Sequence, residues 1–160
     1  MGADKVGLDG KGRMSIRITL PLPPSDNDIY TTIILRKGKK MIPRRQLTTE
    51  ARAYKTKVKQ EVAGLFLTST VEFQKNVQYT CLIRVFFAKV YNLGWPKKAK
   101  TRYKKEDAQD RIKLATDAVS EAIDVDDSHH FLTIISKDED KDDPRLEVTI
   151  REREPMDGKD

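Results

Sequence analysis

Acidic residues in the second half of the chain carry the pattern best suited to chemistry. Asp107 and Asp110 stand three positions apart, and Asp126 and Asp127 are adjacent further along the chain. Residues three apart on a helix project from the same face. Carboxylate oxygens are preferred ligands of hard cations such as Mg²⁺, with water and phosphate oxygens at the remaining positions. The two acidic groups therefore indicate a divalent-cation site, provided that the fold brings them together.

Other chemistries lack the residues that they need. His129 and His130 are the only histidines and Cys81 is the only cysteine, which excludes a zinc site built from several histidines or thiolates. The chain has no phosphate-binding loop, dinucleotide motif or serine-hydrolase elbow. Cys81 lies in an apolar run and is interpreted as a buried, inert thiol in a reducing compartment. Any catalysis must rest on carboxylates.

The spacing of these acids also has a purely structural explanation. An aspartate near a helix start is favoured by capping and by the helix dipole. The Asp126-Asp127-Ser128 sequence is ordinary turn chemistry. From the residues alone, caps and turns remain open beside a metal site.

The charge distribution favours a polyanionic partner. The formal net charge is +6, and the basic residues concentrate in two segments. They are Arg36, Lys37, Lys39, Lys40, Arg44 and Arg45 in the first segment, and Lys97, Lys98, Lys100, Arg102, Lys104 and Lys105 in the second. Solvated loops would give the same runs. The alternative is that both segments bind DNA phosphates around a cation site, without reading sequence.

Hydrophobic periodicity predicts one compact domain of the α/β (α+β) class, with a mixed β-sheet and two main helices. We expect a disordered leader over residues 1–14, a domain over 15–152 and a frayed tail over 153–160. Within the domain we expect strands at 15–20, 77–90, 131–136 and 146–150 and a hairpin with a basic tip at 30–43. Helices are expected at 49–67 and about 108–123.

The predicted second helix and its flanks resemble the RusA family of Holliday-junction resolvases. The resemblance rests on residues 107–113 (DAQDRIK), 117–119 (DAV) and 126–129 (DDSH). Earlier in the chain, residues 16–27 resemble the opening strand and Pro-Pro-Ser-x-Asn loop of that family. Residues 48–55 resemble its first helix, and residues 145–150 its closing strand. The likeness covers about residues 15–151 in consistent order.

This resemblance implies an endonuclease that resolves four-way DNA junctions in recombination and repair, as a homodimer and with Mg²⁺ or, in its place, Mn²⁺ as cofactor. It implies that Asp107 and Asp127 are metal ligands and that Lys113 holds the scissile phosphate. Where the family has aspartate followed by asparagine, this chain has Gln109 followed by Asp110. Gln109 offers a neutral oxygen, and we expect Asp110 to restore the missing charge, so that Asp107, Asp110, Lys113 and Asp127 form the catalytic set.

Two alternative functions and the roles of two residues stay open at this point. A protein of the same fold that binds branched DNA could have a weakened or lost nuclease site through the Gln109 exchange. A basic interaction module without a nucleic-acid role would explain the charges alone. Trp95 either packs against Pro96 or stacks on unpaired bases. His129, where the family usually has glutamine, is either a turn residue or a residue near the metal.

No apolar stretch reaches the roughly 18 residues that a membrane span needs. We therefore expect a cytoplasmic protein without a membrane partner. The family resemblance implies that it is encoded by a bacterium or a phage.

Overall fold

A five-stranded mixed sheet and two helices form the body of the protein. The computed structural model of the chain describes residues 4–67, 69, 72–105 and 107–154. Its strands are β1 (Lys5–Leu8), β2 (Met14–Pro21), β5 (Tyr79–Phe87), β6 (His130–Glu139) and β7 (Arg145–Glu152), and its helices are α1 (Thr49–Phe66) and α2 (Gln109–Ala122). The sheet order is β1-β2-β7-β5-β6, in which β5 and β6 are parallel and the other pairs are antiparallel. The predicted fold class is confirmed.

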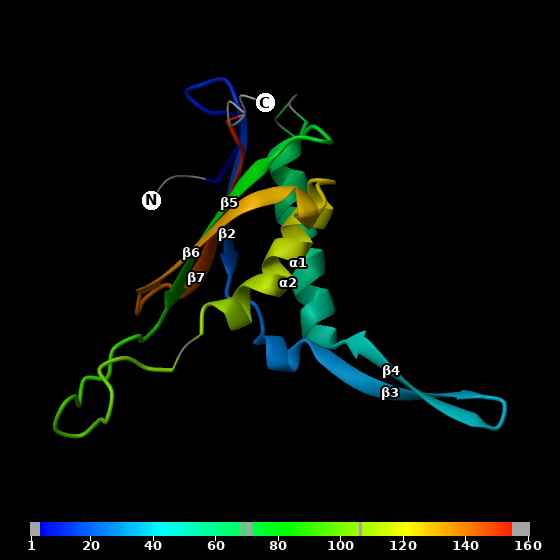
Figure 1. Cartoon of the computed structure of the whole chain (residues 1–160), viewed down its shortest axis with the longest axis vertical. Coiled ribbons are helices and arrows are strands. Elements are labelled where there is room, and N and C mark those ends of the chain that lie inside the picture. The colour runs from blue at the N-terminus through cyan, green and yellow to red at the C-terminus, as the bar shows by residue number, and fades with distance from the viewer. Residues whose placement is uncertain (1–3, 68, 70–71, 106, 155–160) are drawn as a thin grey trace, which may run out of the picture.

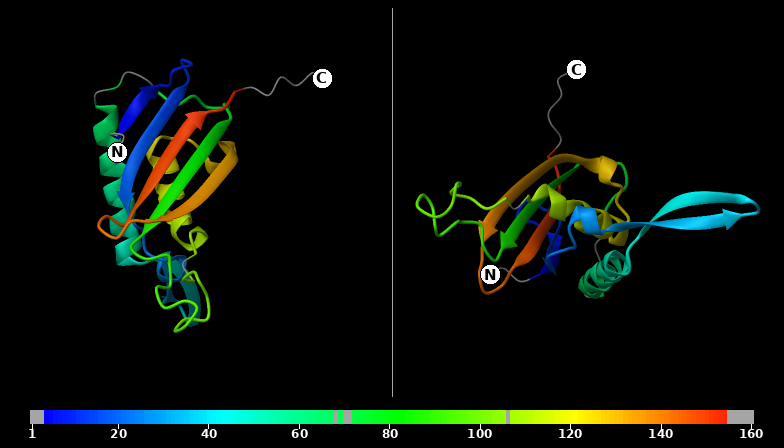
Figure 2. Two further views of the ribbon diagram at one scale, coloured as in Figure 1. Left: turned by 90° about the vertical axis from the view of Figure 1, so that its left-hand side faces the viewer. Right: turned by 90° about the horizontal axis from the view of Figure 1, so that it is seen from below.

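The apolar core lies between the sheet and the helices, which cover one face (Figures 1 and 2). Alternate residues of β2, β5 and β7 point into it, as the period of a strand requires. Helix α1 contributes Ala51, Tyr54, Val58 and Val62, and α2 contributes Leu114, Ala115, Ala118 and Val119. Ala53, also apolar, is exposed. Tyr54 is buried instead, and its hydroxyl donates to the carbonyl oxygen of Pro21 at 3.1 Å.

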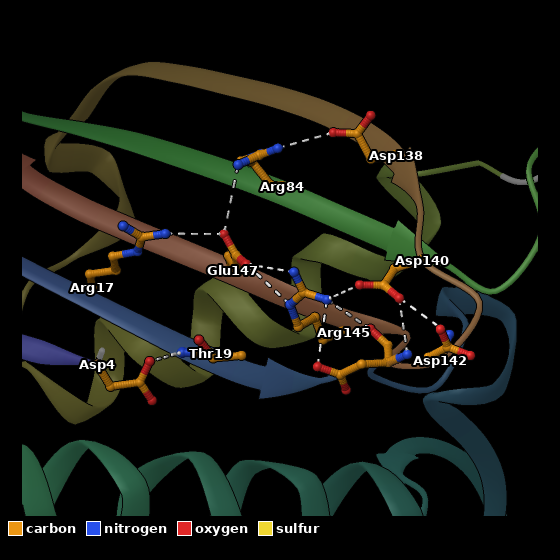
Figure 3. Close-up of polar contacts among 10 residues, drawn as sticks. Asp4, Arg17, Thr19, Arg84, Asp138, Asp140, Asp142, Arg145 and Glu147 are labelled. Atoms are coloured by element: carbon orange, nitrogen blue, oxygen red, sulfur yellow. Dashed lines mark hydrogen bonds and ion pairs between the residues drawn. The ribbon is translucent and has the colours of Figure 1, made fainter. Parts of the chain in front are cut away.

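The opposite face of the sheet carries a network of charges (Figure 3). Glu147 on β7 accepts from Arg145 at 3.0 Å and from Arg17 on β2 at 3.4 Å. Arg145 also pairs with Asp140 at 2.6 Å, and its guanidinium lies 3.9 Å from the centre of the Phe86 ring. Arg145 and Glu147 are only 7% and 8% exposed. Both of these buried charges have partners, and the pair between Arg17 and Glu147 links β2 to β7.

The N-terminal part of the chain differs from the expected disordered leader. Residues 5–8 form β1, which pairs with β2 from Lys5 opposite Arg17 to Leu8 opposite Met14. The intervening turn is closed by Asp9, whose carboxylate accepts from the backbone N of Lys11 and Arg13. This strand has only four residues, too few for a periodic apolar signal, and none of them is fully buried. Residues 1–3 and 155–160 lie outside the described ranges, so the predicted tail is described only at residues 153–154.

Two basic segments project from the body. Strands β3 (Tyr30–Lys37) and β4 (Lys40–Leu47) form a separate two-stranded hairpin, as predicted. Its turn places Gly38 at φ 63, a conformation that glycine adopts without a steric penalty. The second projection, residues 88–105, is called the basic loop below. Figure 1 shows that both leave the body near the start of α2.

Helix α2 lies in the crossover between the parallel strands β5 and β6 and packs against α1. Its attachment to α1 includes ion pairs from Lys55 and Lys59 to Glu121. In the described part of the chain, no helix has both the length and the apolarity that a membrane crossing requires.

Candidate active site

An acidic cleft lies at the C-terminal end of α2. Its volume is about 580 Å³, and it is open to solvent. Helix α2, the turn that follows it and the segment before β5 form its walls. The residues that line it are Lys75, Asn76, Lys113, Asp117, Ser120, Glu121, Asp124, Val125, Asp126, Asp127 and His129. We call this set the acidic cleft.

The end of α2 fixes the aspartate turn beside the helix. Asp124 adopts a positive φ of 56°, and the backbone N of Val125 donates to the carbonyl oxygen of Ser120 at 3.0 Å. This is the Schellman pattern, which reverses the chain after a helix. The buried side chain of Val125 anchors the reversal. Asp126 and Asp127 are thereby held next to the last turns of α2.

The side chains of Asp126 and Asp127 have different surroundings in this turn. The carboxylate of Asp126 accepts from the backbone N of Ser128 at 2.9 Å and caps the short helix η2 (Asp127–His129). Hydrogen bonds from Ser128 lower the pKa of Asp126. Asp127 lies in the first turn of η2 and lines the cleft. The capping explanation therefore accounts for Asp126 but leaves the Asp127 carboxylate available to the cleft.

Lys113 and Asp117 enter the cleft from α2, where they are four positions apart and therefore on one face. Burial raises the pKa of Asp117, Lys113 opposes this shift, and the Asp127 carboxylate adds to it. Within the described part of the chain, neither Asp117 nor Asp127 forms an ion pair, whereas Glu121 and Asp124 are paired with lysines. Two neighbouring carboxylates thus share the cleft with the positive charge of Lys113.

Two polar atoms in the cleft wall lack hydrogen-bond partners. Ser120 Oγ and His129 Nδ1 are buried and unpaired among the described residues. Because buried polar atoms are normally paired, unpaired ones are often satisfied by water or a ligand. His129 is therefore both a turn residue of η2 and part of the cleft.

The acidic residues at the start of α2 lie elsewhere. Asp107 accepts from the backbone N of Gln109 at 2.9 Å, so its carboxylate closes the turn into the helix. Gln109 and Asp110 are exposed in the first turn, and none of the three lines the cleft. We expected the two acidic groups to converge on one cation. Among the described residues, no group of three His, Cys, Asp or Glu side chains is close enough to hold a metal ion.

The structure thus brings together Lys113 and Asp127 from the predicted set, and adds Asp117, Ser120 and His129. Asp117 was visible in the sequence as part of the 117–119 match, and its position four residues after Lys113 placed it on the same helix face. An aspartate on the polar side of an amphipathic helix is common, so this position alone did not distinguish Asp117 as a site residue.

Replacing Asp117 by asparagine is expected to raise the melting temperature at pH 7. The folded-state pKa of Asp117 lies above its unfolded value of about 3.9. The ionised carboxylate therefore costs stability at neutral pH, and this cost disappears as the pH falls below the unfolded pKa. Circular-dichroism melts at pH 7 and at pH 4 check this: the gain should be present at pH 7 and shrink at pH 4. An equal gain at both pH values would contradict it, and Asp142→Asn, in an exposed loop, is the control.

Fold and site together define a class of protein. It is a basic α+β domain in which carboxylates and a lysine share a cleft and exposed cationic segments project from the body near the start of α2, as in proteins that bind and cleave phosphodiesters. The chain belongs to the RusA family: the family described as endodeoxyribonuclease RusA matches residues 10–151. This family resolves Holliday junctions by endonucleolytic cleavage. A search of curated proteins gave no match. The family expected from the sequence is confirmed.

Proposed function

We propose that the protein is a Mg²⁺-dependent endonuclease that resolves four-way DNA junctions in recombination and repair. The family match over most of the chain carries this proposal. The acidic cleft supports it, because Mg²⁺ is usually bound through one or two carboxylates, with water and phosphate oxygens completing its shell. Asp117 and Asp127 provide such a pair. Their donor chemistry fits Mg²⁺, and Mn²⁺ takes the same oxygen ligands.

In the proposed reaction, water hydrolyses one phosphodiester bond in each of two strands. Bound Mg²⁺ would supply an activated water and neutralise charge on the phosphate. Asp127 and Asp117 would hold the ion. The Lys113 ammonium would bind the non-bridging oxygens of the scissile phosphate, where negative charge builds in the transition state. Lys113 is exposed at the cleft, so an approaching phosphate can reach it.

The basic hairpin and the basic loop are proposed to bind DNA phosphates. The six predicted basic residues of the hairpin are exposed, and so are Lys97, Lys98, Lys100, Arg102 and Lys105 of the loop. Both projections lie near the start of α2 (Figure 1), whereas the residues that line the cleft lie toward its other end. A four-way junction is wide enough to contact both ends of α2. Because the basic side chains would contact phosphates, the affinity of the protein for DNA should fall steeply as the salt concentration increases.

The helix-start group has a separate place in the proposal. The family resemblance assigns a ligand role to Asp107, and the Gln109 exchange is the reason why we expect Asp110 to supply the missing charge. All three residues lie at or just before the start of α2. We propose that they bind a cation only together with DNA phosphates, which supply the missing oxygen ligands. Asp110→Asn tests this: undiminished Mg²⁺-dependent cleavage would remove Asp110 from the site.

Homodimerisation is also part of the proposal, because two symmetric cuts require two sites related by a two-fold axis. Strand β6 is an edge of the sheet and exposes Phe131, Leu132 and Ile134. Antiparallel pairing of two β6 edges would satisfy their backbone groups and cover these side chains. Light scattering in solution measures the mass, and a monomer at assay concentration would contradict the dimer. Acting on recombining DNA, the protein is proposed to work in the cytoplasm of a bacterium, encoded by the host or a phage.

A junction-nicking assay tests the function. The junction is incubated with protein and Mg²⁺, Mn²⁺ or EDTA, and labelled strands are resolved on a denaturing gel. Paired nicks at symmetric positions are expected only with a divalent metal. Salt-sensitive binding without nicks would identify the alternative, a branched-DNA-binding protein of the same fold without nuclease activity.

A further inference from the structure

The basic loop exposes three aromatic rings that the proposed cleavage does not use. Tyr91 and Trp95 are each 47% exposed, and Tyr103 is 51% exposed. Trp95 is therefore only partly covered by its own loop, and packing against Pro96 does not bury it. Single exposed apolar residues are common, but several on one projecting segment mark a surface for interaction.

The three rings form a row that includes a planar cation. The ring centres of Tyr91 and Tyr103 are 5.6 Å apart. The guanidinium of Arg102 lies 5.7 Å from the Tyr103 ring centre and 5.9 Å from the Trp95 ring centre. We call these four residues the aromatic row. It offers flat π and guanidinium surfaces of the kind on which nucleic-acid bases stack.

Hydrogen bonds at the base of the loop hold the row in place. Tyr91 and Tyr103 form an antiparallel bridge, and Asn92 N donates to the carbonyl oxygen of Arg102 at 2.9 Å. The carboxylate of Glu139, at the end of β6, accepts from Val90 N at 2.7 Å and Tyr91 N at 3.2 Å. The backbone that carries Tyr91, Arg102 and Tyr103 is thus held before any ligand binds, which lowers the entropy lost on binding.

The charge around the row selects a polyanion. Residues 88–105 contain basic residues and no acidic residue. The basic residues are Lys89, Lys97, Lys98, Lys100, Arg102, Lys104 and Lys105. A positively charged segment combined with aromatic rings is the recognition chemistry of single-stranded nucleic acid: phosphates meet the cations while bases stack on the rings. Bases inside a duplex are already stacked and have no free face to offer.

We propose that the aromatic row binds unpaired DNA bases by stacking, such as bases opened where strands exchange at a junction. The choice of a junction rests on the proposed function, whereas the contact itself requires only unpaired bases. The row would hold opened strands beside the start of α2, into which the basic loop runs (Figure 1).

Fluorescence of Trp95 tests the contact directly, because it is the only tryptophan of the chain. The protein is titrated in EDTA with fluorescein-labelled oligothymidylate and with an abasic oligomer of the same length, while anisotropy of the label reports binding. Unlabelled copies of the same oligomers are used for the tryptophan emission. Bound oligothymidylate is expected to quench Trp95, and the bound abasic oligomer is not. Equal emission with the two bound oligomers, or no binding of oligothymidylate, would overturn the proposal.

Variants of the loop separate stacking from charge. Trp95→Ala is expected to weaken oligothymidylate binding roughly tenfold, whereas Trp95→Phe keeps a ring and most of the affinity. Leu93→Ala is the matched control, since Leu93 is 87% exposed on the same loop and has no ring. Equal affinities of the Ala and Phe variants would refute stacking by Trp95.

The two proposals fail in different ways. Asp127→Asn should lose cleavage but keep the base-dependent quenching of Trp95. Quenching by oligothymidylate in a protein that never cleaves a junction would leave the stacking proposal intact and refute the nuclease. Junction cleavage without any base-dependent quenching would leave the nuclease proposal intact and refute stacking by the aromatic row.

Discussion

Asp127→Asn lowers the rate of Mg²⁺-dependent junction cleavage by at least about 100-fold, while junction binding in EDTA stays within about twofold of the parent. The substitution keeps the size of the side chain and removes the charge that would hold the cation. The overall fold should be unaffected, because Asp127 is exposed and the cap of η2 comes from Asp126. Single-turnover gels give the rate, and anisotropy of a labelled junction gives the affinity.

Asp142→Asn is the matched control for this prediction. It makes the same chemical change in the exposed loop between β6 and β7, at the other end of β6 from η2. Its cleavage rate should equal that of the parent. A retained rate in Asp127→Asn would show that the cleft carboxylate does not take part in hydrolysis.

Lys113→Ala is expected to lower the cleavage rate roughly 100-fold, because one positive charge would be lost where the phosphate gathers charge. Metal binding to Asp127 and Asp117 should persist and become somewhat tighter, since a repelling cation has been removed from the cleft. Lys113→Arg keeps the charge and should recover part of the rate. Single-turnover rates at saturating DNA separate this effect from binding.

Two outcomes would contradict the role of Lys113. One is an Ala variant that is as fast as the parent at saturating DNA. The other is a loss that higher DNA concentration restores completely, because that would make Lys113 a binding residue only. Lys141→Ala, in the exposed loop between β6 and β7, controls for a change of net charge.

Much of the fold was predictable because apolar residues recur along the sequence with the spacing of helices and strands. The apolar face of α2, with Ala115 and Val119 at its centre, follows from helical spacing, and the interior place of β5 between β7 and β6 follows from its apolar content. Strand β1 was missed because exposed residues on an edge strand carry no such period. The place of β1 in the sheet depends on its pairing with β2, and the four residues of β1 alone do not reveal that pairing.

The site was predictable in part. The sequence placed Asp127 in a turn beyond α2 and Lys113 on the polar side of the helix, and the Schellman turn at Asp124 brings the two to one cleft. The sequence alone did not show how far apart Asp107 and Asp127 lie, at opposite ends of α2. A helix of 14 residues spans roughly 20 Å, so Asp107 cannot reach a turn beyond the far end without a strongly bent chain.

Paramagnetic Mn²⁺ tests most directly where the cation binds, because it broadens the NMR signals of nearby amides. ¹⁵N-labelled protein is titrated with Mn²⁺ below one equivalent and without DNA. The signals of Asp117, Asp127 and their neighbours in the cleft should broaden first, and they should stay sharp in Asp127→Asn. Cleft signals that stay sharp in the parent while other acidic segments broaden would contradict the assignment of the metal site to the acidic cleft.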